Sequence, residues 1–239
     1  MNAIQPDIQV TQPEQGSLIS VAGPGETGVF LARAGAGKTA CLTHVAIDRL
    51  LRGMPVLHVC VDILPEKTKV WYHELLRNIF ADRPENEMAE LEHEAEKFRF
   101  ILAYMNQTFT PEKLEQSINK LKEQALFDPS LIILDGIGFD QNPRRVFEDL
   151  RSLAKRHAAP MWMSARTHRH MPIVNERGIP YPCHETDDLF DSILKLELED
   201  EEGVRIVALK QSPFREAMEP VILDPHTYLL RRSGPAGAR

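Results

Sequence analysis

No apolar run in this sequence approaches the roughly 20 residues that a helix needs to cross a bilayer. The N-terminal residues also lack a basic segment followed by an apolar stretch, which is the pattern of a secretion signal. Cysteine is scarce, and Cys41, Cys60 and Cys183 show no paired spacing. Unpaired cysteines are typical of reduced thiols in a reducing compartment. We therefore expect a cytoplasmic protein with no membrane partner.

The chain also lacks the basic excess of proteins that grip nucleic acid along their whole surface. Its formal net charge is −7 at pH 7, which disfavours nucleic-acid binding over the whole surface. A local basic patch could still bind nucleic acid. We find no internal repeat. With 239 residues, 43% of them hydrophobic and 26% charged, the chain fits one large α/β domain with a substantial core.

The most informative segment comprises residues 29–43, which read VFLARAGAGKTACLT. An apolar run leads into a small-residue turn, and an apolar-periodic segment follows, which predicts a strand, a phosphate loop (residues 33–39) and a helix. Gly35 and Gly37 let the backbone curl, so that successive N–H groups can point at one anion near a helix N-terminus. The predicted nucleotide-binding residues are Ala34, Gly35, Ala36, Gly37, Lys38, Thr39 and Ala40.

This segment resembles the Walker A motif of P-loop NTPases. The resemblance implies that Lys38 reaches the β- and γ-phosphates of ATP and that the Thr39 hydroxyl binds Mg²⁺. One position departs from the family pattern, because Ala32 stands where the motif opens with glycine. A turn that merely links strand to helix is the alternative, and the Gly-Lys-Thr ending argues against it.

Asp135 follows the apolar run of residues 131–134, at the carboxyl end of a predicted buried strand. The carboxyl ends of parallel strands meet at one edge of a sheet, so we expect Asp135 beside the phosphate loop. A carboxylate there can hold Mg²⁺ through water, which is the Walker B role that this segment resembles. Thr39 and Asp135 therefore form the predicted metal site. A turn or helix-capping aspartate ahead of Gly136 is the alternative.

Strands and helices alternate from residue 28 to residue 165, which predicts right-handed crossovers and a mainly parallel twisted sheet with helices on both faces. Later segments predict antiparallel β-hairpins: strands at 194–198 and 204–209 around Gly203, and a final pair at 221–223 and 228–230. A short edge strand is expected at 18–22. We expect a flexible lead-in over 1–16, a single domain over 17–230, and a disordered tail over 231–239.

Asp62 lies at the end of the strand that follows the phosphate-loop helix, where a carboxylate could activate the attacking water. The chain resembles the RecA/KaiC/DnaB class of ATPases in the order of its elements. These are the phosphate loop, a helix, a strand that ends in a carboxylate, a later strand that ends in Asp135, and terminal hairpins. This resemblance implies a RecA-like fold and Mg²⁺-dependent ATP hydrolysis. Relatives usually carry glutamate at the position of Asp62, so the shorter side chain predicts slow hydrolysis. The implied catalytic residues are Lys38, Asp62, Asp135 and Lys210.

Residues 207–212 are similar to the family's late strand, which ends in a lysine that reaches the γ-phosphate of the neighbouring subunit. Lys210 matches that lysine, whereas Ser212 stands where an arginine often follows, leaving Arg215 as a substitute. The resemblance implies an active site shared between subunits, and therefore a homo-oligomeric ring or filament. An exposed charge at a strand end is the alternative for Lys210.

Residues 168–188 form a long polar loop, placed where RecA-like recombinases and helicases have a DNA-contacting loop. A contact with the neighbour's nucleotide, or with solvent only, is at least as well supported, because Tyr181 alone offers stacking surface. Ser164 and Arg166 flank the position where relatives sense the γ-phosphate. The basic side chains at and near the loop are Arg166, His168, Arg169, His170 and Arg177. A zinc set of His168, His170, Cys183 and His184 fits no compact ligand spacing.

The leading hypothesis is an Mg²⁺-dependent, KaiC-like ATPase that acts through self-assembly in regulation or mechanical work. One alternative is a DNA-binding recombination or helicase-like accessory ATPase, although nucleic acid is not the favoured partner. Another is a nucleotide-dependent scaffold that does not hydrolyse ATP, motivated by the short Asp62 and the missing arginine.

Overall fold

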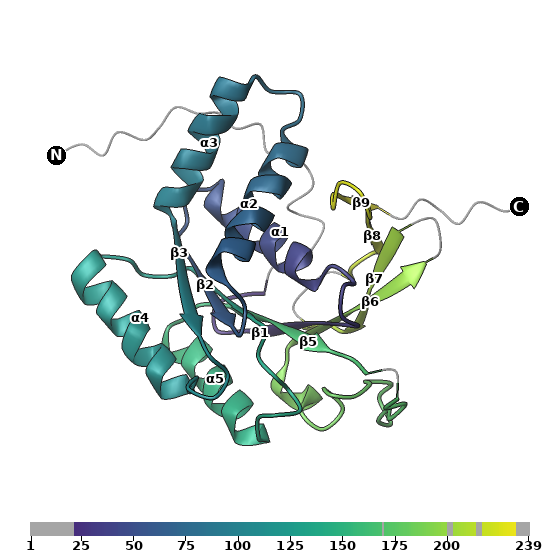
Figure 1. Cartoon of the computed structure of the whole chain (residues 1–239). Coiled ribbons are helices and arrows are strands. Elements are labelled where there is room, and N and C mark those ends of the chain that lie inside the picture. Colours follow the sequence, from purple (N-terminus) through teal and green to yellow (C-terminus); the bar gives the residue numbers. More distant parts are fainter. Residues whose placement is uncertain (1–21, 169, 200–202, 214–216, 233–239) are drawn as a thin grey trace, which may run out of the picture.

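The computed structural model describes residues 22–168, 170–199, 203–213 and 217–232 (Figure 1). The strands are β1 (Thr27–Ala32), β2 (Val56–Val61), β3 (Arg99–Tyr104), β4 (Leu131–Asp135), β5 (Met161–Arg166), β6 (Ser192–Glu199), β7 (Gly203–Lys210), β8 (Val221–Leu223) and β9 (Leu230–Arg232). The helices are α1 (Lys38–Leu50), α2 (Pro65–Ile79), α3 (Glu85–Lys97), α4 (Pro111–Ala125), α5 (Arg144–Arg156) and the short 3₁₀ helix η2 (Asp187–Leu189).

The strands form one nine-stranded sheet in the order β3-β2-β4-β5-β1-β6-β7-β8-β9. The pairs from β3 to β6 are parallel, and β7, β8 and β9 add antiparallel pairs at the far edge. The predicted mainly parallel sheet with C-terminal hairpins is therefore confirmed. Strand β5 lies between β1 and β4, so the phosphate-loop strand and the strand of Asp135 are not direct neighbours.

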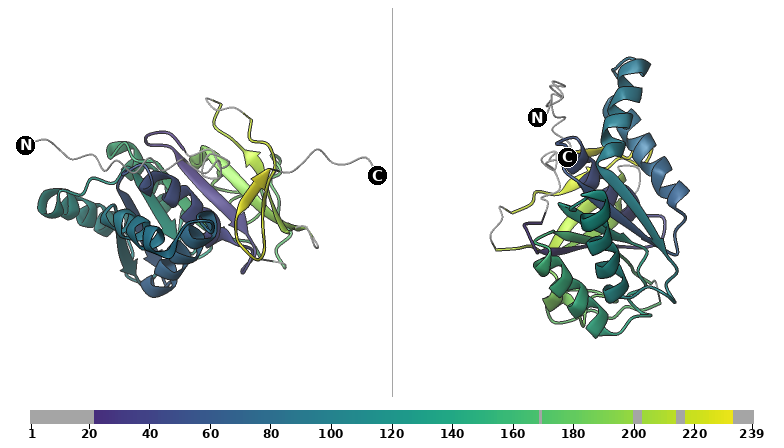
Figure 2. Two further views of the ribbon diagram at one scale, coloured as in Figure 1. Left: turned by 90° about the horizontal axis from the view of Figure 1, so that it is seen from above. Right: turned by 90° about the vertical axis from the view of Figure 1, so that its left-hand side faces the viewer.

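Helices cover both faces of the parallel part of the sheet. Helices α1, α2 and α3 lie on one face, and α4 and α5 lie on the other (Figures 1 and 2). All residues of β1, β2 and β4 are buried, as expected for strands that are covered on both sides and have nearly continuous apolar sequences. Helices α2 and α4 begin with prolines, and the Thr110 hydroxyl accepts a hydrogen bond from the Lys113 N–H at 3.3 Å.

Two aromatic contacts mark the two halves of the core. On the α1 face, the rings of Phe30 and Trp162 stack with centroids 4.7 Å apart. A Cβ atom on Gly28 would lie 2.7 Å from the Trp162 ring, so this strand position has room for glycine only. On the opposite face, the rings of Phe139 and Phe147 stack at 4.4 Å.

Some predicted boundaries were wrong. Strand β9 comprises Leu230–Arg232 and not residues 228–230. Tyr228 has a φ of 56°, and the Asp224 carboxylate accepts hydrogen bonds from the N–H groups of His226 and Thr227, which makes residues 224–229 a turn. Arg231 and Arg232, which were predicted to lie in a disordered tail, therefore belong to a strand. The predicted lead-in 1–16, most of the predicted strand 18–22, and residues 233–239 lie outside the described residues.

Within the described ranges, no helix is both long enough and apolar enough to span a membrane. Cys41, Cys60 and Cys183 are free and buried.

Candidate nucleotide site

The phosphate loop joins the end of β1 to the start of α1. Gly35 and Gly37 have φ values of 76° and 90°, in the left-handed region that favours glycine. Gly37 is the N-cap of α1, and a Cβ atom there would lie 2.5 Å from a methyl carbon of Leu223. Ala32 is the last residue of β1 and is buried in regular strand conformation, so the position that departs from the Walker A pattern does not need glycine.

The predicted nucleotide-binding residues all lie at this loop and the first turn of α1. Ala34 and Gly35 are exposed, Ala36 and Ala40 are buried, and Gly37, Lys38 and Thr39 are partly exposed. An α-helix leaves its first N–H groups without intrahelical acceptors, and these groups carry a partial positive charge. The segment can therefore bind an anion such as a phosphate group.

The Lys38 ammonium lies over the loop. Its Nζ donates to the carbonyl oxygens of Ala32 at 3.1 Å and Arg33 at 2.7 Å. Burial lowers the pKa of Lys38, and the nearby Asp135 carboxylate opposes that shift. The loop thus holds a partly desolvated cation next to its N–H groups, which suits a highly charged anionic ligand.

Asp135 and Thr39 meet as the sequence predicts. The Thr39 hydroxyl donates to Asp135 Oδ2 at 2.7 Å, and Asp135 is only 2% exposed. Mg²⁺ prefers oxygen ligands, and a hydroxyl beside a carboxylate provides them. The residues present therefore fit a magnesium ion held between the phosphate loop and β4.

A second hydroxyl reaches the same carboxylate from β5. Ser164 Oγ donates to Asp135 Oδ1 at 2.6 Å. The sequence places Ser164 only near a γ-phosphate sensor position, because its contact with Asp135 depends on the order of β4 and β5 in the sheet. The other candidate at this point, Arg166, is exposed and lies close enough to Lys38 to help lower the pKa of that ammonium.

Asp62 lies at the same edge of the sheet, just beyond β2, with a φ of 53° and an exposed side chain. Its Oδ1 accepts a hydrogen bond from the Asn106 N–H at 2.9 Å, and Asn106 Nδ2 in turn donates to Gln141 Oε1. The described hydrogen bonds of Asp62 therefore run to the end of β3 and the loop after it, and not to the phosphate loop. No sequence signal indicates this link, since Asn106 and Gln141 belong to no recognisable motif.

Lys210, at the end of β7, binds its own chain. Its Nζ donates to the Asp187 carbonyl oxygen at 2.8 Å. Burial lowers the pKa of Lys210, and the carboxylates of Asp187 and Asp191 oppose that shift. Ser212 is buried, and its hydroxyl donates to Glu26 Oε1 at 2.8 Å. Arg215, the suggested substitute for the family's arginine, lies outside the described residues.

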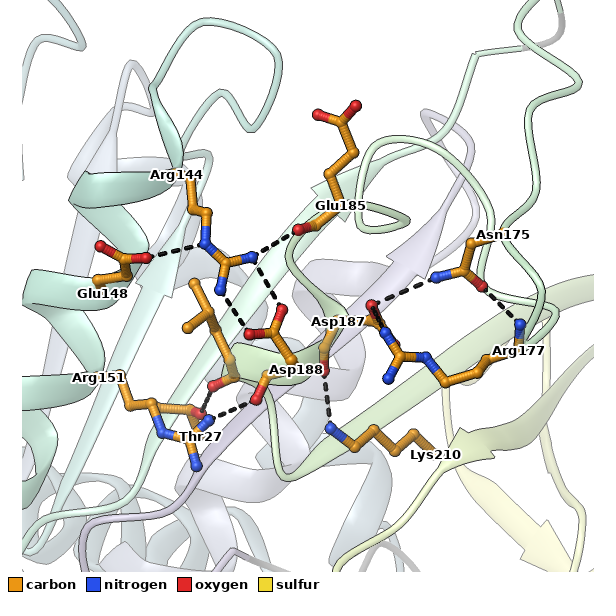
Figure 3. A network of polar contacts seen from close by, with 11 residues as sticks. Thr27, Arg144, Glu148, Arg151, Asn175, Arg177, Glu185, Asp187, Asp188 and Lys210 are labelled. Carbon is orange, nitrogen blue, oxygen red and sulfur yellow. Dashed lines mark hydrogen bonds and ion pairs between the residues drawn. The ribbon is translucent and has the colours of Figure 1, made fainter.

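The described part of the polar loop, residues 170–188, packs against α5 and the end of β7 (Figure 3), whereas Arg169 lies outside the described residues. Arg144 donates to Asp188 Oδ1 at 2.9 Å and to the Glu185 carbonyl, and Arg151 donates to the Asp188 carbonyl at 2.7 Å. Within the loop, Arg177 donates to the buried Asp187 carboxylate at 2.7 Å. Arg177, one of the basic side chains considered for DNA, is therefore already paired with a carboxylate of its own chain.

The hypothetical zinc set receives no support from the structure. Among the residues that the structure describes, no group of three or more His, Cys, Asp or Glu side chains is arranged to hold a metal ion. Cys183 is fully buried, and burial raises the pKa of its thiol far above the ordinary value, which opposes formation of the thiolate that zinc needs.

A cavity of about 420 Å³ borders the phosphate loop on the side of β6. The cavity is lined by Leu31, Ala32, Arg33, Ala36, Thr167 and residues 195–199. The lining is partly apolar and partly charged, and the volume lies in the range of small-molecule sites. The contribution of β6 to this cavity was not predictable, because the alternating pattern of β6 indicates only a hairpin strand.

The strand order and the position of the phosphate loop are those of the RecA-like P-loop fold. Among solved structures, the chain is similar to one described as an ATPase domain, with a TM-score of 0.66 and 10% sequence identity. The match covers 89% of this chain and 86% of that chain. At this identity the likeness establishes a shared fold. No model of a known protein family matches the sequence, and no curated protein matches it.

Proposed function

We propose that this chain is an Mg²⁺-dependent RecA-like ATPase that binds ATP at the phosphate loop and hydrolyses it slowly. The observation that carries the proposal is the 2.7 Å contact between the Thr39 hydroxyl and the buried Asp135 carboxylate. This contact joins the helix that starts at the phosphate loop to a carboxylate two strands away. A site that holds phosphate and a metal ion next to each other is suited to nucleoside triphosphates.

Each residue of the site has a separate task in this proposal. The N–H groups of the loop and of the first turn of α1 bind phosphate oxygens, and Lys38 exchanges its two loop carbonyls for phosphate oxygens. Thr39 and Asp135 hold Mg²⁺, which neutralises the charge of the phosphates when it is bound. Because Lys38 is partly desolvated, its attraction to phosphate is less screened than that of a surface lysine.

The cavity beside β6 is where we place the nucleoside. Thr39 and Asp135, which would hold Mg²⁺ near the terminal phosphates, lie on the β4 side of the phosphate loop. The opposite end of the triphosphate then leaves toward β6, where the cavity of about 420 Å³ borders Arg33 and Ala36. Leu196 and Leu198 supply apolar surface there for a base.

Hydrolysis in this proposal depends on Asp62 as the residue that orients the attacking water. Its exposed carboxylate lies at the edge of the sheet that carries Asp135. Its hydrogen bond to the Asn106 N–H holds one oxygen toward the loop after β3. Slow turnover follows, since a short side chain with that contact has limited reach toward a γ-phosphate.

Self-assembly completes the site in this proposal. Lys210 would leave the Asp187 carbonyl and reach the nucleotide of a neighbouring subunit in a ring or filament. The chain would then act in regulation or mechanical work driven by assembly. A nucleic-acid role is less favoured, because Arg177 pairs with Asp187 and the net charge is −7.

A nucleotide-dependent scaffold without hydrolysis is the second candidate, and the hydrogen bond between Asp62 and Asn106 favours it. A carboxylate that stays turned toward the loop after β3 would leave the attacking water without a base. ATP would then stabilise an assembly without being consumed.

The test is the rate of ATP hydrolysis per subunit over a wide range of protein concentration, with Lys38→Ala as the blank. A rate that rises with concentration and vanishes in the blank supports a shared active site, and mixed assemblies with Lys210→Ala would then locate the lysine. A rate independent of concentration contradicts the shared site but not the ATPase. Tight ATP binding without turnover at any concentration supports the scaffold.

A further inference from the structure

The surroundings of Ser164 determine where its hydroxyl hydrogen is donated. Ser164 lies near the end of β5, is 5% exposed, and accepts a hydrogen bond from the Gly136 N–H at 3.0 Å. A backbone N–H can only donate, so the single hydroxyl hydrogen of Ser164 remains free to be given elsewhere. It goes to Asp135 Oδ1, at 2.6 Å.

The two oxygens of Asp135 are therefore held from opposite sides. Ser164 donates to Oδ1 and the Thr39 hydroxyl donates to Oδ2 at 2.7 Å. The backbone after Asp135 is also fixed: Gly136 has a φ of 92°, and a Cβ atom there would lie 2.2 Å from the Val61 carbonyl oxygen. Each oxygen of the carboxylate thus has a hydrogen-bond donor, and the backbone conformation just after Asp135 requires glycine.

We propose that Ser164 is a positioning residue for the magnesium site: it orients Asp135 so that the oxygen shared with Thr39 faces the metal. This inference rests on the proposed Mg·ATP function. Ser164, near the end of β5, would then orient the Asp135 carboxylate and not contact the γ-phosphate. Hydrogen-bonding partners of metal-binding carboxylates typically change metal affinity by about 10- to 100-fold when they are removed.

The experiment measures the Mg²⁺ dependence of nucleotide binding, without hydrolysis, by titrating a fluorescent ATP analogue and the matching ADP analogue with and without Mg²⁺. We compare the wild type with Ser164→Ala, Ser164→Cys and Ser164→Thr. The matched control is Ser130→Ala, which removes a hydroxyl at the other end of β4 that donates to the Pro55 carbonyl at 2.8 Å. Thermal unfolding identifies variants that do not fold.

We expect Ser164→Ala to raise the half-saturating Mg²⁺ concentration by about 10- to 100-fold, with metal-free nucleotide binding unchanged. Ser164→Cys keeps only a weak donor, so it should raise the half-saturating Mg²⁺ concentration by an intermediate amount. This variant takes the place of Ser164→Ala if Ser164→Ala does not fold. Ser164→Thr, which keeps the hydroxyl, should retain wild-type Mg²⁺ dependence, as should Ser130→Ala.

Three results would overturn the role of Ser164: an unchanged Mg²⁺ dependence in the folded Ala or Cys variant, the same loss in Ser130→Ala, or a selective loss of metal-free ATP binding relative to ADP. The last result would mean that Ser164 contacts the γ-phosphate. Failure of the proposed function looks different, because the wild-type chain would then bind neither analogue at any Mg²⁺ concentration.

Discussion

Two histidines on the α1 side of the sheet are held neutral by burial. His44 Nε2 donates to the Tyr228 carbonyl at 2.6 Å, and His58 Nδ1 lies 2.9 Å from the Tyr72 hydroxyl. Burial lowers the pKa of each imidazole to about 4. In the unfolded chain both would titrate near the ordinary histidine pKa of about 6.5.

The unfolded chain therefore binds protons that the folded chain does not, between about pH 6.5 and about pH 4. The stabilising effect of these neutral histidines is fully present above that window and is lost as pH falls through it. Each histidine contributes a slope of up to about 1.4 kcal/mol per pH unit to the free energy of unfolding. Urea unfolding of the wild type at several pH values between about 7 and about 5 should show this loss.

The matched variants are His44→Gln and His93→Gln, since His93 is exposed on α3. Only His44→Gln should reduce the change of the free energy of unfolding with pH. It removes the buried titrating group and keeps a side-chain donor for the Tyr228 carbonyl. Equal slopes in His44→Gln and the wild type would contradict this account.

Asp62→Asn tests the charge of the proposed base without changing its size. The amide oxygen can still accept the Asn106 N–H, so nucleotide binding should stay within about twofold of the wild type, whereas hydrolysis should fall by about 100-fold or more. Steady-state hydrolysis and equilibrium binding measure the two effects separately. Wild-type turnover by Asp62→Asn would remove Asp62 from the mechanism.

Residues within one motif were predictable, and contacts across strands were not. The phosphate loop and Asp135 carry their signals in a few adjacent residues: glycines, a lysine and a hydroxyl in one segment, an apolar run ending in a carboxylate in the other. The contacts of Ser164 with Asp135 and of Asn106 with Asp62 join residues 29 and 44 positions apart. They depend on which strands are neighbours, and no single stretch of sequence carries that information.

At the scale of elements, the turn after β4 depends on a glycine. Gly136 has a φ of 92°, and a Cβ atom would lie 2.2 Å from the Val61 carbonyl. We expect Gly136→Ala to lower the free energy of unfolding by about 2 to 4 kcal/mol, since it combines left-handed strain with a backbone clash. Chemical denaturation measures the change.

Gly178→Ala is the matched control for that substitution. Gly178 also has a positive φ, 78°, but no atom lies within 4 Å of the position that a Cβ atom would take there. Only the left-handed strain remains, so the loss should be about 1 to 2 kcal/mol. Equal losses at the two positions would show that the Val61 carbonyl does not constrain the turn.

Elements with buried apolar runs were predicted well, and elements shaped by turn conformation were not. Strands β2 and β4 stand out because both faces are covered, which keeps their sequences almost entirely apolar. The start of β9 was misplaced by two residues because Tyr228 adopts a left-handed conformation that its residue type does not indicate. No sequence pattern indicates that Arg144, Arg151 and Lys210 attach the long polar loop at Asp187 and Asp188 to the rest of the chain.

At the scale of the whole molecule, the parallel part of the sheet gathers the proposed chemistry at one edge. The phosphate loop follows β1, Asp62 follows β2, and Asp135 and Ser164 lie at the ends of β4 and β5. Strand β6, which is parallel to β1, lines part of the cavity, and its antiparallel neighbour β7 carries Lys210. Sequence alternation predicted this architecture, but it could not predict that β5 separates β1 from β4.

Isothermal titration calorimetry of the full chain measures whether the phosphate loop binds Mg·ATP. The wild type should bind about one Mg·ATP per chain, and Lys38→Ala should weaken that affinity by about 10- to 100-fold or more, as expected for loss of a charge-assisted contact. Lys97→Ala, which removes an exposed lysine of α3, should bind like the wild type. Equal affinity of Lys38→Ala and the wild type for Mg·ATP would contradict the account.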